Sequence, residues 1–101
     1  MTLVTVSHNP DKLIFEFEGH TGYADKGEDI VCAGVSSIAL LCANVCKELG
    51  GDIEMEEGHA KFIMNESIIA ERFSGVLLDT LLLMAMEYKE NLDVKELYNE
   101  D

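Results

Sequence analysis

The stretch Asp29–Gly51, DIVCAGVSSIALLCANVCKELGG, decides the fold because it holds a long helix together with both of its end signals. Asp29 is a favourable N-cap residue, and the pair Gly50-Gly51 is a typical helix stop. Apolar residues cover most of the circumference of the helix between them, a pattern typical of a buried helix. We therefore expect a central helix that other elements cover.

Two hairpins are expected, one on each side of this helix. Residues 2–7 and 13–17 are rich in β-branched and aromatic residues, and the turn formers His8-Asn9-Pro10-Asp11 separate them. After the helix, residues 52–57 and 59–64 alternate apolar and polar side chains around Gly58. Each pair of segments predicts two antiparallel strands.

A second helix is predicted over residues 67–89, capped by Asn65 or Ser67. It is apolar on more than one face, so it needs cover from the sheet and from another helix or a second copy of the chain. The tail NLDVKELYNED, residues 91–101, reads equally as a short edge strand or a frayed helix. The order β-β-α-β-β-α, with a possible short terminal strand, predicts an α+β fold with two helices packed on a largely antiparallel sheet.

The size and charge of the chain limit its partners. With 101 residues, 48% of them hydrophobic, residues 1–101 suit a single domain. Twenty acidic residues against seven basic ones give a net charge of −13, which repels nucleic acid and anionic membranes and attracts basic peptides. The alternative is that this charge serves solubility alone.

A soluble, cytoplasmic protein without a metal or cofactor is expected. The start lacks a secretory signal, and the longest strongly apolar stretch, Val76–Met86, is shorter than the ~20 residues of a membrane span. Three cysteines leave at least one free thiol. The three histidines do not pair with a cysteine at the spacing of structural zinc sites, so no metal is expected; they are His8, His20 and His59.

The chemistry is expected at Cys32 and His20. If Asp29 is the N-cap, Cys32 is the third residue of the helix, where free backbone N–H groups and the helix dipole favour a thiolate. The same N–H groups can donate to the oxyanion of a tetrahedral intermediate. His20 follows a strand, and the loop from Thr21 to Glu28 is long enough to bring its ring to the sulfur. Such a pair predicts nucleophilic catalysis.

Spacing alone does not specify this pair, and other interpretations stay open. Cys42 and Cys46 are expected to be inert core residues, because they lie in the middle of the helix. One rival is a non-catalytic acidic module that binds a basic ribosomal protein segment. Another is a redox-sensing thiol, which would need a resolving cysteine, whereas Cys42 lies about 15 Å along the helix from Cys32.

The segment Gly19–Ser37, GHTGYADKGEDIVCAGVSS, resembles the signature of the ribosomal-processing cysteine protease family known as Prp. That signature has a Gly-His, a Gly-rich loop and an Asp-Ile-Val-Cys-Ala run followed by a serine, in this order. The element order and the chain length are also similar to the family. One departure is Thr21-Gly22 after the histidine, where alanine is common in relatives.

The resemblance implies a cysteine endopeptidase with His20 and Cys32 as its catalytic pair. It implies that members are cytoplasmic homodimers that remove the N-terminal extension of a large-subunit ribosomal protein, cutting after two aromatic residues. A basic N-terminal peptide is thus the implied partner. The predicted supporting residues are Gly19, Asp29, Ala33 and Ser36. The loop is expected to be disordered without substrate and to close over the peptide, with Thr21, Gly22, Tyr23 and Gly27 as its substrate positions.

Overall fold

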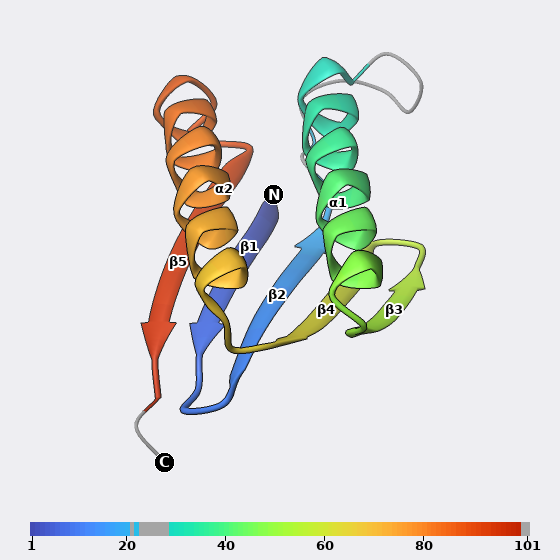
Figure 1. The fold of residues 1–101 in the computed structure, drawn as a ribbon. Coiled ribbons are helices and arrows are strands. Elements are labelled where there is room, and N and C mark those ends of the chain that lie inside the picture. Colours follow the sequence, from blue (N-terminus) through green and yellow to red (C-terminus); the bar gives the residue numbers. More distant parts are fainter. Residues whose placement is uncertain (21, 23–28, 100–101) are drawn as a thin grey trace.

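The computed structural model describes residues 1–20, 22 and 29–99, and these form a five-stranded sheet with two helices on one face (Figure 1). The strand order is β3-β4-β2-β1-β5. The elements are β1 Thr2–His8, β2 Lys12–Gly19, α1 Ile30–Glu48, β3 Asp52–Glu56, β4 His59–Asn65, α2 Ile68–Glu87 and β5 Leu92–Tyr98. The predicted α+β fold and element order are confirmed.

The sheet is largely antiparallel, with one parallel pair at its edge. The ladders β1–β2, β2–β4 and β3–β4 are antiparallel, whereas β5 pairs with β1 in parallel. The tail that the sequence left undecided is therefore an edge strand over residues 92–98. Leu92 is buried beside Thr2 and Val94 packs on the core, so burial of two apolar side chains favours the strand over a helix.

Both helices begin at a side-chain cap. Asp29 Oδ1 accepts a hydrogen bond from the Cys32 N–H at 2.8 Å, which confirms Asp29 as the cap of α1. At α2 the alternatives are resolved in favour of Ser67, whose Oγ accepts from the Ala70 N–H at 3.0 Å. These bonds satisfy N–H groups that would otherwise lack a partner.

The core lies between the helices and the covered face of the sheet. Alternate residues of β2 point to this face. Phe15 lies tilted against Phe73 with ring centroids 5.9 Å apart, and Phe17 meets Phe62 edge-on at 6.0 Å. Burying one such side chain contributes about 1.5–3 kcal/mol to the free energy of unfolding. The residues between them, including Glu16, point to the opposite, uncovered face.

Helix α1, rather than Val76–Met86, is the segment of the described residues that comes nearest to a membrane span. Its 19 residues, with a mean hydropathy of 1.8, meet the length and composition of a membrane span. Its buried residues, however, face the sheet, and α1 contacts β3 and β4. Only 33% of its most apolar stretch is buried, and Leu40 and Leu41 are exposed, so the expectation of a central helix covered by other elements is wrong: the sheet covers one side of α1. Length and composition alone do not make it a membrane anchor.

Candidate active site

One pocket lies where the start of α1 meets the end of β2 and the β3–β4 hairpin, and its volume is about 320 Å³. Both His20 and Cys32 line it. Cys32 is half-buried at the third residue of α1, and His20 is exposed directly after β2. The end of β2 and the start of α1 thus place His20 and Cys32 on the same concave surface.

The backbone around His20 is fixed by two glycines. Gly19 has a φ of +91°, and a Cβ at this position would lie 2.5 Å from the carbonyl oxygen of Met1. Its N–H donates to the Gly58 carbonyl at 2.8 Å. The ring of His20 lies against Gly58, because a Cβ on Gly58 would be 3.3 Å from His20 Nε2. The β3–β4 turn therefore forms the wall on which the imidazole rests.

Backbone amides at the start of α1 are partly occupied. Residues 30–33, the first turn of α1, include no acidic side chain. The Cys32 N–H donates to Asp29 Oδ1, and the Ala33 N–H donates to the Asp29 carbonyl at 3.0 Å. These two amides are therefore not the oxyanion donors in this arrangement, and Asp29 acts as a cap.

The other predicted site residues are distributed unevenly. Gly19 and Ser36 line the pocket with the pair, and Ser36 lies one helical turn beyond Cys32. Ala33 is exposed and is not among the lining residues. Gly22 is exposed, with a φ of +69°. The remaining predicted substrate positions, Thr21, Tyr23 and Gly27, lie outside the described residues, as does most of the predicted lid.

Sequence reasoning missed the far wall of the pocket. This wall comes from the β3–β4 hairpin and includes Met55, Glu56, Gly58, His59 and Ala60. The hairpin lies beside His20 because β4 pairs with β2, and no local sequence pattern predicts that pairing. Alternation of apolar and acidic residues around Gly58 predicted the hairpin but not its neighbour.

His59 in this wall is held by carboxylates on the uncovered face of the sheet. Its Nε2 lies 2.7 Å from Glu16 Oε2. The hydrogen bond to Glu16 raises the pKa of His59, and the same bond lowers the pKa of the Glu16 carboxyl. Each charge stabilises the other, so His59 carries a proton to a higher pH than a free imidazole does.

The other two cysteines belong to the core, as predicted. Cys42 and Cys46 are fully buried on the sheet side of α1. Burial raises the pKa of both thiols, which keeps them protonated and unreactive near neutral pH. Among the three thiols, Cys32 alone is accessible from the pocket.

We expect Gly58→Ala to slow by about tenfold any reaction that depends on the position of the His20 ring, since misplacing a reacting group costs rate steeply. The new methyl group would press on His20 Nε2. The left-handed φ of +75° also costs about 1–2 kcal/mol of stability for any residue with a Cβ. The measurement is steady-state kinetics together with urea unfolding.

Gly50→Ala is the matched control, because Gly50 has a similar φ of +72° and no atom within 4 Å of an added Cβ. It should lose comparable stability and keep its activity. Equal loss of activity in both variants would show that the contact between Gly58 and His20 is unimportant.

Three comparisons identify related proteins. The family model described as Cysteine protease Prp matches residues 1–95. The ribosomal processing cysteine protease Prp of Bacillus subtilis (strain 168) is 34% identical over 99 residues, covering 87% of this chain and 88% of the relative.

Solved structures agree in fold. The essential ribosomal processing protease Prp from S. aureus, in complex with a covalently linked product peptide, matches with a TM-score of 0.81 and 26% identity, covering 95% of this chain and 99% of that one. SMU.848 from Streptococcus mutans matches with a TM-score of 0.75 and 22% identity, covering 98% and 96%. Matching in sequence over nearly its whole length and in fold, this chain belongs to the cysteine protease Prp family.

Proposed function

We propose that this protein is the endopeptidase that removes the N-terminal extension of a large-subunit ribosomal protein, with His20 and Cys32 as its catalytic pair. The observation that carries the proposal is that the one accessible thiol and an exposed imidazole line the same pocket. The named activity of the relatives from B. subtilis and S. aureus supports the substrate class.

The pocket suits an apolar peptide segment beside the reacting carbonyl. Around Cys32 it is lined by apolar side chains from β2, α1 and β3, and these belong to Phe17, Val35, Ala39, Leu40 and Met55. Apolar walls of this kind bind aromatic or aliphatic side chains. The aromatic pair that precedes the scissile bond in the family's substrate is a fitting occupant.

The reaction is an acyl transfer in two halves. His20 takes the proton from the Cys32 thiol, and the thiolate attacks the scissile carbonyl to give a tetrahedral oxyanion. The C–N bond breaks, His20 protonates the leaving amine, and a thioester joins Cys32 to the N-terminal part of the substrate. Water, deprotonated by His20, then hydrolyses the thioester and restores the thiol.

The net charge of −13 supports a basic substrate, because opposite charge speeds encounter at low salt. The same charge disfavours nucleic acid and anionic membranes as partners. We place the protein in the cytoplasm, where ribosomal proteins are made and cysteines stay reduced. Residues 1–101 are proposed to act as a single protease domain.

A homodimer is the proposed assembly. Both helices expose large apolar side chains away from the pocket, and these include Leu41, Val76, Leu83 and Met86. Exposed apolar surface of this kind usually marks an interface. The sequence predicted that α2 is covered on two sides, and the sheet covers one side of it. Sedimentation at micromolar concentration tests this assembly.

The test of the function is cleavage of a synthetic peptide that spans the N-terminus of the large-subunit ribosomal protein. We expect one cut, directly after two adjacent aromatic residues, identified by the masses of both products. A matched peptide with alanine at those two positions should stay intact. Binding without cleavage would favour the non-catalytic acidic module, and cuts at scattered positions would contradict a processing protease.

A further inference from the structure

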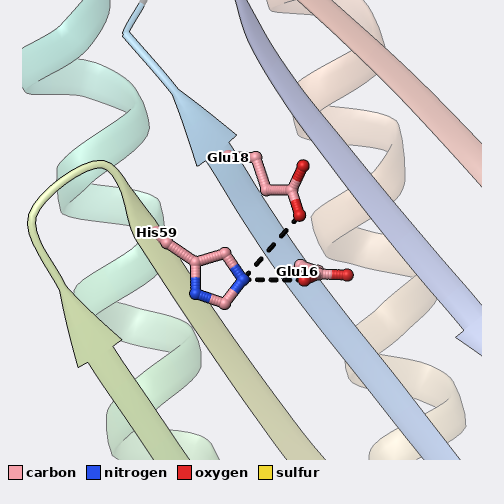
Figure 2. A group of neighbouring side chains, drawn as sticks. All are labelled: Glu16, Glu18 and His59. Atoms are coloured by element: carbon pink, nitrogen blue, oxygen red, sulfur yellow. Dashed lines mark hydrogen bonds and ion pairs between the residues drawn. The ribbon is translucent and has the colours of Figure 1, made fainter.

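A second group of side chains gathers on the uncovered face of the sheet. Figure 2 shows Glu16 and Glu18 on β2 and His59 on β4 pointing toward one another. His59 Nε2 lies 2.7 Å from Glu16 Oε2 and 3.8 Å from Glu18 Oε1. The three potential ligand atoms all lie within 4.8 Å of one another. The proposed proteolysis uses none of these side chains.

The backbone holds these three groups in a fixed relation. Glu16 and Glu18 share a face because residues two apart on a strand point the same way, and Glu18 pairs directly with His59 across the antiparallel ladder. Strand positions of this kind are more rigid than loop positions. The donor atoms therefore meet without any folding of a loop.

The separations match those of a small divalent metal site. Zn²⁺ binds histidine nitrogen and carboxylate oxygen at about 2.0–2.2 Å in tetrahedral geometry, which places neighbouring donors about 3.4 Å apart. The observed separations of 2.7 and 3.8 Å lie on either side of that value. To reach that value the His59 and Glu16 atoms must separate by about 0.7 Å and the His59 and Glu18 atoms must approach by about 0.4 Å, with water completing the coordination.

The far nitrogen of the imidazole also faces a carboxylate. His59 Nδ1 lies 3.8 Å from Glu56 Oε1 of β3, an ion-pair contact that is too long for a hydrogen bond. Metal-binding histidines characteristically direct their second ring N–H to a carboxylate, which orients the ring and makes the ligand nitrogen more basic. Three carboxylates on two strands, β2 and β3, thus surround one imidazole on β4, and their combined charge attracts a cation.

We propose that Glu16, Glu18 and His59 form a site for a divalent transition-metal ion such as Zn²⁺, which fastens the β3–β4 turn to β2 behind the catalytic pocket. The link to the pocket runs through the backbone. Gly58, next to His59, accepts the Gly19 N–H and carries the ring of His20. An ion that joins β2 to β4 here would hold the wall that supports His20.

The test uses the full chain with Cys32→Ser, so that the catalytic thiol does not compete for the metal. Metal-free protein is titrated with ZnCl₂ by calorimetry, and we expect one ion per chain with a dissociation constant in the micromolar range. Zinc at 100 times that constant should raise Tm by about 10 °C. Hydrogen exchange of the amides in the β3–β4 turn should slow in parallel.

Variants in the same background separate this site from adventitious binding. His59→Gln and the double variant Glu16→Gln/Glu18→Gln should weaken zinc binding by about 100-fold, and Glu56→Gln by about tenfold. Glu54→Gln is the control, because Glu54 is an exposed acid on β3 that pairs with Lys61, and it should bind within twofold of the parent.

Two results would overturn the proposal. Binding of less than one ion per chain, or binding that His59→Gln leaves unchanged, would remove the site and leave His59 as a simple ion-pair partner of Glu16. Stoichiometric binding without slower exchange in the turn would refute the bracing role. Neither result depends on which peptide the protease cleaves.

Discussion

Replacing Cys32 by serine is expected to lower kcat/KM for peptide cleavage by about 10⁴-fold or more, the scale seen when a catalytic nucleophile is lost. A hydroxyl is a far weaker acid than a thiol, so neither the helix start nor His20 can generate a comparable nucleophile. Peptide affinity should stay within about twofold, since the pocket keeps its apolar walls. Product formation by mass spectrometry and binding by fluorescence anisotropy measure the two quantities.

The matched control for this variant is Ser37→Ala. Ser37 is exposed on the same helix, is not among the pocket residues, and its hydroxyl donates to the Ala33 carbonyl one turn back. It should cleave like the parent. Cleavage that survives in Cys32→Ser would refute Cys32 as the nucleophile and would favour the alternative of an acidic binding module.

Replacing His20 by alanine is expected to lower kcat/KM by about 10²–10⁴-fold, the usual contribution of a positioned general acid–base. The variant should also slow the reaction of Cys32 with iodoacetamide, because the imidazole no longer takes the proton. Peptide mapping should find label on Cys32 alone, since Cys42 and Cys46 are buried. The alkylation rate is read from the intact mass over time.

Stability separates a chemical effect from a folding effect in this variant. His20 is exposed, so its truncation should leave Tm nearly unchanged. In denaturant, where burial no longer protects the other thiols, all three cysteines should take the label. A native Cys32 that reacts equally fast with and without His20 would argue against a working pair.

Local sequence signals predicted most of the fold. Asp29 and Ser67 stand where a helix needs a cap, and the alternation on both sides of Gly58 marks a hairpin. The partners of these elements were not predictable in the same way. Pairing of β2 with β4, and of β1 with β5, joins segments far apart in the chain, and it depends on how the assembled core is buried.

The candidate site was likewise predictable only where local sequence signals mark its residues. His20 and Cys32 were candidates because one follows a strand and the other begins a helix, and the resemblance of residues 19–37 to a known family singled them out. The hairpin wall with Gly58 and His59 was missed, because only the three-dimensional pairing brings it near. The proposed metal site could not be predicted from histidine and cysteine at short spacing. Two of its ligands, Glu18 and His59, are far apart in the sequence and become neighbours only through the pairing of β2 with β4.

The parallel pairing of β5 with β1 has a practical consequence for anyone producing the protein. Thr2 lines the pocket and the Met1 carbonyl lies close to Gly19, so a fusion partner or affinity tag joined ahead of residue 1 would emerge beside the pocket. Tyr98 lies beside His8, at the opposite end of the sheet (Figure 1). Purification handles therefore belong after the last strand, where they leave the pocket clear.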